Sequence, residues 1–590
     1  MYLANLCRLV LLFVVIDACL PAFGQNDNAE TRFHAITDRV WEFDMAENPL
    51  RATATGDHRF NDRLPSESIE DQIRRQKQYQ QFITEVEAID RAKLDRSNQI
   101  NFDIFVQLLR DRVTEDEFET YLIPITNREG FHLDFVEAPN KFPFNTVKDY
   151  ENYVARLHAF RGYVTQNIEL MREGLKKGIT LPSEVLGGLL DRVNPHIVDD
   201  PSVSLLFAPF KKFPERVNES DRERLAQAAK QAISQSVVPA FRDLKDFFAN
   251  EYLPGARGTT GALALPNGRE FYRYRVKHFT TLDVSPEQIH ETGLSEVKRI
   301  RAEMAQVMKR AKFEGDHSAF IKFLRTDERF YPKNKAELLE KTAFVLKKID
   351  GQLPSLFKTL PRTPYGIKEV PEYIAPKTTT AYYNPPAGDG SRAGFYFVNT
   401  YNLKSRPLFE VEALSLHEAV PGHHLQIALQ QELNLPKYRR FAGFTVFVEG
   451  WGLYSERLGL ETGFYEDPYS DFGRLSYEMW RACRLVVDTG IHYLGWTRKQ
   501  AIDFMAENTA LSIHNIEAEV DRYIAWPGQA VAYKMGELKI RELRTKAEKE
   551  LAGKFDVREF HDVVLGSGAV PLKILEENVA SFIARVKSGP

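Results

Sequence analysis

The sequence has 590 residues, of which 43% are hydrophobic and 27% charged, and its formal net charge is -4. These proportions are typical of a soluble globular protein, and the nearly balanced charge argues against nucleic-acid binding. The length alone would allow about four domains. Because no low-complexity linker and no internal repeat divides the chain, we predict one compact unit with two halves, residues 25–265 and 266–590.

Residues 1–24 have the pattern of a secretory signal peptide. Arg8 is their only basic residue, an apolar run follows it, and Ala22-Phe23-Gly24 fits the small residues of a cleavage site. A lipid anchor on Cys19 is the alternative, although Asp17 fits poorly in front of it. We therefore expect an exported protein, periplasmic or secreted, without a membrane-spanning helix.

Long segments with apolar residues at helical spacing fill the first half. They are Ser68–Ile89, Thr146–Lys177 and Ser220–Asn250. We expect them to form a scaffold and one wall of a cleft, and we assign them no chemistry. In the second half, Ser285 and Pro286 are typical of a helix start, and this helix should run to about Lys312.

The second half also predicts a small β-hairpin and three more helices. The hairpin strands, rich in β-branched and aromatic residues, are Thr378–Tyr383 and Ala393–Thr400. The helices cover Ser476–Leu494 and the two sides of Pro527-Gly528. The predicted fold class is therefore mainly α, with a small sheet.

Three histidines and a glutamate lie close together in an apolar segment between His417 and His424. His417-Glu418 begins like the zinc-peptidase motif H-E-x-x-H, in which a metal ligand is followed by the general base. In that motif the second histidine follows one helical turn later, but here Pro421 occupies this position. The alternative is a helix end at which the histidines only cap carbonyl groups.

Pro421-Gly422 is expected to form a local bulge that takes up two extra residues. His423 then reaches the position of the second ligand. On a regular helix His424 would lie about 10 Å along the axis from His417, too far for one ion with bonds of about 2 Å. We therefore favour His423 as the ligand and His424 in the surroundings of the metal, while the reverse assignment stays open.

A glutamate downstream, Glu449, could complete a His-His-Glu site and leave a fourth position for water. Its neighbours are apolar, which argues against a surface charge. Glu456 lies two helical turns further on the same face, where it could orient a ligand or pair with an arginine. The alternative for both is an ordinary surface glutamate.

Polar residues of two later helices are candidates for further roles. In Ser476–Leu494 a polar stripe predicts Asp488 near the metal and Arg484 or His492 near the substrate, and an internal Asp488–His492 pair is the alternative. Zinc peptidases need a donor to the developing oxyanion, for which Tyr533 and then Tyr523 are candidates. Lys534 and Arg522 are candidates for substrate binding. Ordinary core tyrosines are an equally good interpretation.

Three motifs resemble a large bacterial family long labelled only as a domain of unknown function. They are H-E-A-V-P-G-H-H-L-Q, E-G-W-G-L-Y-S-E and R-Y-I-A-W-P-G-Q-A. Members of that family are often exported or lipoproteins and look like zinc peptidases. The spacing of histidine and glutamate is also distantly similar to that of the helical gluzincins, such as angiotensin-converting enzyme and the thimet-type oligopeptidases.

This resemblance implies a large helical zinc-peptidase-like fold with a deep cleft and one Zn²⁺ per chain. It also implies that Tyr396 to Asn399 form an edge strand that pairs with peptide substrate, although a hairpin that merely packs is the alternative. We expect hydrolysis of short peptides, with Glu418 taking a proton from water and passing it to the leaving amine. The alternatives are a zinc amidase or esterase for a non-peptide substrate, and a non-catalytic exported binding protein.

Overall fold

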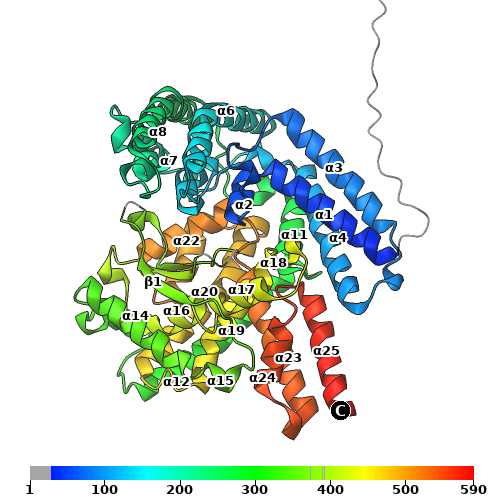
Figure 1. The fold of residues 1–590 in the computed structure, drawn as a ribbon. Coiled ribbons are helices and arrows are strands. Elements are labelled where there is room, and N and C mark those ends of the chain that lie inside the picture. The colour runs from blue at the N-terminus through cyan, green and yellow to red at the C-terminus, as the bar shows by residue number, and fades with distance from the viewer. Residues whose placement is uncertain (1–27, 373, 389, 391, 590) are drawn as a thin grey trace, which may run out of the picture.

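The structure, a computed structural model, describes residues 28–372, 374–388, 390 and 392–589. The expected signal peptide and the alternative lipid anchor at Cys19 lie outside these residues. The described chain is mainly helical, as the sequence predicts, and carries one small sheet (Figure 1). None of its helices is both long and apolar enough to cross a bilayer.

Ten helices form the N-terminal part of the described chain. They are α1 (Ala29–Glu47), α2 (Pro49–Ala54), α3 (Ile69–Glu87), α4 (Arg96–Glu117), α5 (Phe131–Glu137), α6 (Val147–Lys177), α7 (Leu189–Val193), α8 (Glu219–Ala232), α9 (Val238–Phe247) and α10 (Leu253–Gly255). The predicted helices correspond to α3, α6 and the run from α8 to α9, which a π-helical segment joins without a break. The helix ends follow local signals: a capping box with Thr146 starts α6, and Gly178, with φ 71°, ends it.

Fifteen helices follow in the described C-terminal part. They are α11 (Gly268–Thr280), α12 (Pro286–Arg310), α13 (His317–Thr326), α14 (Lys335–Asp350), α15 (Leu353–Leu356), α16 (Val411–Glu418), α17 (His423–Glu432), α18 (Lys437–Arg440), α19 (Thr445–Leu458), α20 (Pro468–Tyr493), α21 (Arg498–Asn508), α22 (Ile513–Ala525), α23 (Ala532–Leu551), α24 (Val557–Leu565) and α25 (Leu572–Ser588). Ser285 caps α12 as predicted, and α22 ends before Pro527-Gly528. Helix α20 begins eight residues earlier than the predicted Ser476.

The sheet has three strands, β1 (Tyr365–Glu369), β2 (Ala381–Asn384) and β3 (Gly394–Val398), in the order β1-β3-β2. The predicted hairpin is present, because β2 and β3 are antiparallel neighbours. Strand β1, which the sequence analysis did not identify, pairs with β3 in parallel. Strand β3 is therefore the central strand, and the expectation that it is a free edge for a substrate is wrong.

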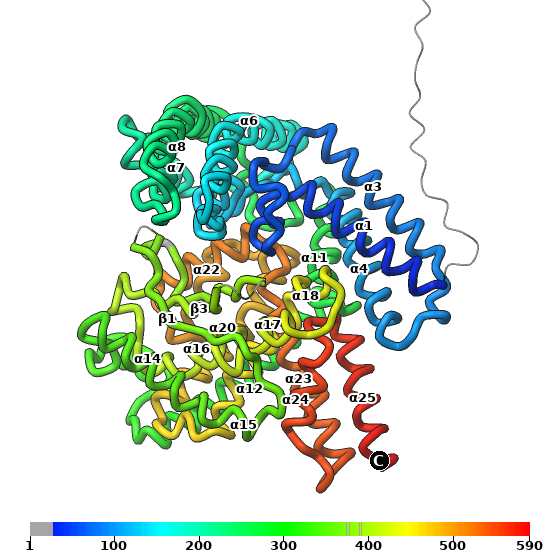
Figure 2. Tube along the Cα trace, viewed as in Figure 1, coloured from blue at the N-terminus to red at the C-terminus, as the bar shows by residue number. Residues whose placement is uncertain are grey.

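Helix α20 is the centre of the C-terminal part, and nearly all its residues are buried. It packs on α12, α21, α22, α23 and α16. Helices α19 and α23 cross at two glycines: a Cβ on Gly450 would come within 2.6 Å of the Gly536 Cα atom. Figure 2 shows the C-terminal α25 beside α23, on the side away from the sheet. Helices α16 and α17, which carry the metal motif, thus lie between the sheet and the layer formed by α19 and α20.

Candidate metal centre

The metal motif is interrupted between α16, which ends at Glu418, and α17, which begins at His423. The two extra residues are taken up by this break and not by a bulge within one helix. Pro421 cannot donate the hydrogen bond that would continue α16, since proline has no N–H group. The indole N–H of Trp451 in α19 donates to the carbonyl of Pro421 over 2.8 Å. Helix α19 therefore holds the break in place.

Two glycines bring the backbone and the first histidine close together. A Cβ on Gly422 would lie 1.9 Å from the carbonyl oxygen of His417, which is a direct clash with backbone. A Cβ on Gly452 in α19 would lie 2.7 to 3.0 Å from ring atoms of His417. The imidazole of His417 therefore packs against bare backbone of α19, in a place where no other residue type fits.

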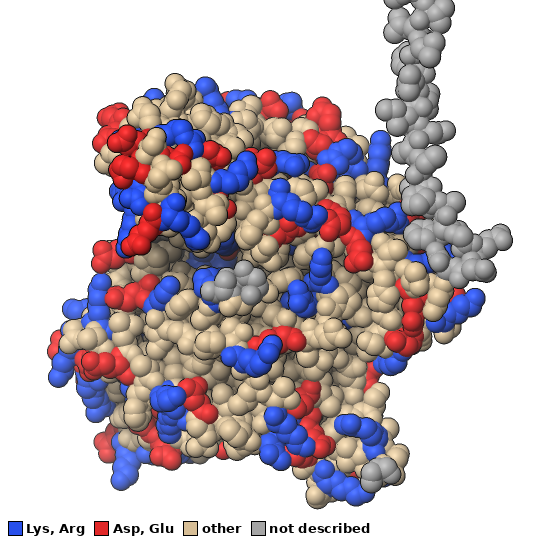
Figure 3. Space-filling model, in the orientation of Figure 1, with Lys and Arg blue, Asp and Glu red and all other residues tan. Residues whose placement is uncertain are grey.

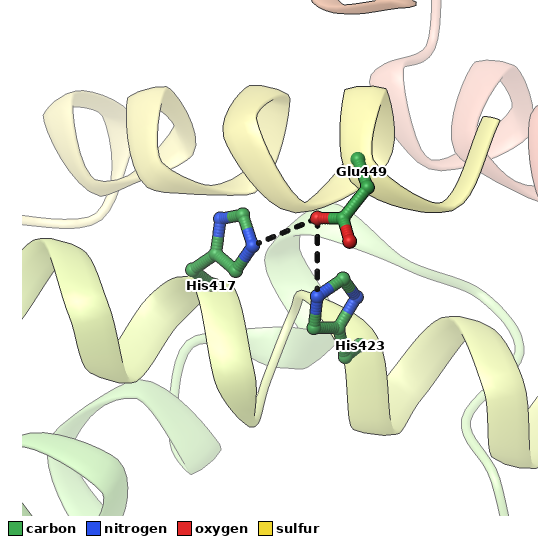
Figure 4. A group of neighbouring side chains, drawn as sticks. All are labelled: His417, His423 and Glu449. Carbon is green, nitrogen blue, oxygen red and sulfur yellow. Dashed lines mark ion pairs between the residues drawn. The ribbon is translucent and has the colours of Figure 1, made fainter. Parts of the chain in front are cut away.

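His417, His423 and Glu449 point at one another from α16, α17 and α19 (Figure 4). The Nε2 atoms of His417 and His423 lie 3.5 and 3.6 Å from the same carboxylate oxygen of Glu449. One ligand atom of each residue lies within 4.8 Å of the others. The predicted grouping is therefore present, with His423 and not His424 beside His417.

This geometry fits a tetrahedral zinc ion. Two bonds of about 2.1 Å at a tetrahedral angle separate their ligand atoms by about 3.4 Å, which is close to the two distances above. Two imidazoles and one carboxylate are also the donor set of known catalytic zinc sites, which keep one position open. The side chain of Glu449 keeps 19% of its surface exposed, so solvent reaches the group.

Glu456 occupies the position predicted for it behind His417. Its carboxylate lies 2.9 Å from Nδ1 of His417 and 3.2 Å from the guanidinium of Arg481. It therefore both orients the candidate ligand and pairs with an arginine. Burial disfavours the charged imidazole of His417, but hydrogen bonds with Glu449 and Glu456 raise its pKa to about 9.

His424 turns away from the group toward the sheet. Its Nδ1 accepts from the hydroxyl of Tyr383 at 2.7 Å, and its Nε2 donates to the carbonyl of Thr363 at 3.1 Å. Burial lowers its pKa to about 4, so the ring is neutral. Because both nitrogens are engaged, His424 fastens α17 to β2 and has no atom free for the ion.

Glu418, the candidate general base, ends α16 next to His417 and is partly exposed. Within the described residues, no hydrogen bond or ion pair holds its carboxylate. Tyr396, expected in a substrate groove, is instead buried behind it on the central strand. Burial and the nearby charge of Glu418 raise the pKa of Tyr396.

Asn399, also expected in the groove, is a buried structural residue. Its amide donates to the carbonyls of Ala375, Thr378 and Thr379, and its oxygen accepts from the N–H of Tyr401. All its donors and acceptors are therefore used to shape the loop before β2. From the sequence alone, a polar residue at the end of a strand gives no signal that distinguishes substrate binding from a structural role.

The two candidate tyrosines differ in what surrounds them. The Tyr523 hydroxyl accepts from Trp480 and Arg484 and donates to Glu519, and the side chain is fully buried. It has no hydrogen bond left for a substrate. Tyr533 is partly exposed, and burial together with the charge of Glu449 raises its pKa. Of the two, only Tyr533 has a pKa that the charge of a residue in the candidate metal group affects.

Arg484 and Arg522 converge on one buried carboxylate, Glu519, at 3.1 and 3.0 Å. A third arginine, Arg128, reaches the same carboxylate at 3.2 Å from the N-terminal part. Arg128 belongs to the half for which no chemistry was expected from the sequence. No local pattern marks it, because its partner lies almost 400 positions away in the sequence.

In the described structure, neither Asp488 nor His492 contacts a residue of the candidate metal group. The carboxylate of Asp488 accepts from the Tyr272 hydroxyl at 2.6 Å and the Gly528 N–H at 3.1 Å, and burial raises its pKa to about 7. His492 bridges Ala262 and Tyr523 through its two nitrogens. Asp488 and His492 therefore bond neighbouring segments inside the core.

Lys534, a candidate for binding a substrate carboxylate, is fully buried in a salt-bridge cluster. Its ammonium group lies 2.8 Å from Glu478, 2.8 Å from Glu537 and 3.0 Å from Glu296. Burial opposes its charge, but these carboxylates raise its pKa. The residue joins α23 to α12 and α20, and it has no opening toward a substrate.

The chain is similar to proteins whose descriptions assign no activity. A family model described as "Bacterial protein of unknown function (DUF885)" matches residues 49–579. A crystal structure described as "the putative lipoprotein from Colwellia psychrerythraea" is 30% identical, with a TM-score of 0.89 over 94% of this chain and 99% of that chain. A "putative lipoprotein of unknown function" from Shewanella oneidensis, 17% identical, shares the fold with a TM-score of 0.69 over 93% and 99% of the two chains. A comparison with curated proteins gave no match.

Proposed function

Because this chain belongs to the bacterial family of unknown function DUF885, whose description assigns no activity, we propose its function from the site: it is an exported zinc-dependent metallopeptidase. The observation that carries the proposal is the group of His417, His423 and Glu449, together with Glu418, which follows His417 directly in the chain. A site that only held a metal would need the first three residues. It would have no need for a partly exposed carboxylate without a hydrogen-bond partner among the described residues.

The chemistry of peptide hydrolysis can be assigned to these side chains. Zinc, when bound, supplies Lewis acidity to water and to the scissile carbonyl. Glu418 takes a proton from the attacking water and later passes it to the leaving amine. The hydroxyl of Tyr533 donates a hydrogen bond to the developing oxyanion. Glu456 and Arg481 keep His417 in the orientation that directs Nε2 toward Glu449.

Substrate size and location follow from broader features. Figure 3 shows a furrow between the N-terminal helices and the part below them that carries the sheet, with Lys and Arg side chains at its rim and inside it. A furrow between two walls suits a short, extended peptide better than a folded protein. Export agrees with the two related structures, both of which are described as lipoproteins.

The decisive experiment compares the mature protein with its Glu418→Gln variant. We expect one zinc per chain in both, and cleavage of a mixed peptide library only by the unchanged protein, with a loss of about 10²- to 10⁴-fold in kcat for the variant. Glu466→Gln is the matched control, since Glu466 is exposed and lies outside the site. An active Glu418→Gln variant would show that Glu418 is not the base.

Two other functions predict different results in the same experiment. A zinc amidase or esterase would hold zinc and spare all peptides, but would hydrolyse an amide or ester of another class. A non-catalytic binding protein would hold zinc and turn over neither panel. Absence of zinc after metal reconstitution would overturn the metal centre itself.

A further inference from the structure

A cluster of arginines stands out between the two halves of the chain. Arg128, Arg484 and Arg522 all contact the carboxylate of Glu519, at distances of 3.0 to 3.2 Å. Arg128 also donates to the carbonyl of Ala518 at 2.9 Å. One negative charge therefore faces three positive charges, and Glu519 is the one carboxylate that these arginines bond within the described residues.

The imbalance is unusual for charges inside a protein. Buried charges are normally compensated, because transferring an unpaired ion from water is costly. The Lys534 cluster obeys this rule: Glu296, Glu478 and Glu537 face Lys534, Arg299 and Arg541. Around Glu519, three arginines bond this one carboxylate; the carboxylate of Glu129 lies in the field of Arg128 and Arg522 but forms no ion pair with either in the described structure. One Nη atom of the almost fully buried Arg484 has no hydrogen-bond partner in the described structure.

The cluster is reachable from solvent on one side. The side chains of Arg128 and Arg522 keep 22% and 13% of their surface exposed, whereas Glu519 keeps 2%. Helix α22, which carries Glu519 and Arg522, lies between the N-terminal helices and the sheet in Figure 1, where Figure 3 shows the furrow. An anion that approaches this cluster from solvent would therefore meet Arg128 and Arg522 before Glu519.

The cluster also adjoins the candidate metal centre through Tyr533. The guanidinium of Arg484 lies 4.2 Å from the centre of the Tyr533 ring. Arg522 donates to the side-chain oxygen of Gln529 at 2.6 Å, four residues before Tyr533 on the same stretch of chain. Tyr533 precedes Gly536 by three residues, and the backbone of Gly536 meets that of Gly450, the residue after Glu449, since a Cβ on Gly450 would lie 2.6 Å from the Gly536 Cα atom. A substrate reaching from the metal group past Tyr533 would arrive at the arginines.

We propose that Arg128 and Arg522, backed by Arg484, bind a carboxylate of the substrate, so that cleavage occurs near the C-terminus of a peptide. Arginine suits this task, because its planar fork matches a carboxylate in two hydrogen bonds. The proposal rests on the proposed peptidase function. It goes further by naming the end of the peptide that the furrow recognises and by giving the N-terminal half a part in the site.

The test compares N-acetylated tripeptides with a free C-terminus and the same peptides with a C-terminal amide. Binding is measured by calorimetry to the zinc-loaded Glu418→Gln protein, and hydrolysis is measured with the unchanged protein. We expect the free acids to bind at least about tenfold more tightly than the amides, because an amide cannot form the charge-assisted hydrogen bonds that a carboxylate forms with arginine. Amidated peptides that carry an internal glutamate distinguish a terminal carboxylate from a side-chain carboxylate.

Variants of the arginines test whether the substrate carboxylate binds at this cluster. Arg522→Gln and Arg128→Gln are expected to raise Kd for the acids by about tenfold or more while leaving the amides unchanged, and Arg522→Lys should restore part of the loss. Arg498→Gln is the matched control, since Arg498 of α21 pairs with Asp521 of α22 outside the cluster. If a glutamine variant does not fold, the acid-to-amide ratio of the unchanged protein and the lysine variant still decide the question.

The outcomes separate this proposal from the peptidase itself. Equal binding and equal hydrolysis of acids and amides would overturn the carboxylate subsite and leave the peptidase intact. Preference for internal glutamate over a free C-terminus would overturn the terminal assignment. Tight, arginine-dependent binding of acids without any hydrolysis would support the subsite and reject the peptidase.

Discussion

Nδ1 of His417 lies 2.9 Å from a carboxylate oxygen of Glu456, on the side of the ring opposite to Glu449. This contact selects the tautomer of His417 in which Nε2 is free to act as a ligand. The carboxylate is itself held by Arg481 and is almost completely buried. The orientation of His417 is therefore decided by a residue outside the candidate metal group.

Replacing Glu456 by glutamine is expected to weaken zinc binding by about 10- to 100-fold, the usual effect of losing a carboxylate behind a ligand histidine. The affinity can be measured by competition with a chromophoric chelator. Glu461→Gln is the control, because Glu461 pairs with Arg544 at the surface. An unchanged zinc affinity of the Glu456 variant would mean that the ring needs no such support.

The two adjacent histidines are expected to behave in opposite ways. His423→Ala should abolish stoichiometric zinc binding, because it removes one of three ligands. His424→Ala should keep the zinc and lower the melting temperature, since it breaks the contacts with Tyr383 and Thr363. Metal content after dialysis and a thermal scan separate the two effects. Loss of zinc in the His424 variant alone would reverse the assignment.

The two tyrosines should also separate. Tyr533→Phe is expected to lower kcat by about 10²- to 10³-fold with little change in KM, as the loss of one oxyanion donor does elsewhere. Tyr523→Phe should instead destabilise the protein by about 1–3 kcal/mol, because Arg484 and Trp480 lose a buried acceptor. Steady-state kinetics and denaturant unfolding give the two readouts. A kinetic effect confined to Tyr523 would contradict this division.

Asp488 predicts a specific dependence of stability on pH. Its pKa is about 7 in the folded chain, above the ordinary value of 3.8, so the folded state holds a proton that the unfolded state has lost. The free energy of unfolding should therefore fall as pH rises from about 4 to about 7, by up to about 1.4 kcal/mol per unit.

Asp488→Asn removes this titration while keeping an oxygen that accepts from Tyr272 and Gly528. We expect the variant to melt at a higher temperature than the unchanged protein at pH 8, and the difference to shrink toward pH 4. Thermal scans over this range provide the measurement. A difference that does not vary with pH would show that Asp488 is ionised in the folded protein.

The parts of the fold and site that the sequence predicted depend on local signals. Ser285 and Thr146 start α12 and α6 because capping acts within one turn. The grouping of His417, His423 and Glu449 was also predictable, because the spacing around Pro421 left one histidine at the right distance from the first. Strand β1 was missed, since its parallel pairing with β3 depends on contacts between distant segments.

The remaining errors share one physical cause. The period of a helix shows which residues lie on one face, but not what that face contacts. Asp488, His492 and Lys534 lie on such faces, and in each case the partner is another part of the core rather than a substrate. Arg128 is the converse case, because only the folded chain shows that it contacts Glu519.

The backbone contact between Gly450 and Gly536 has a consequence for how proteins with this fold can diversify. Gly450 follows Glu449 directly, and Gly536 lies one turn after Tyr533. The close backbone contact between the two glycines therefore fixes the position of Glu449 relative to the hydroxyl of Tyr533. Substitutions of side chains cannot shift α19 relative to α23 at this contact. Variation among proteins with this fold is therefore expected around Arg128, which comes from a separate part of the chain, while the candidate metal group stays the same.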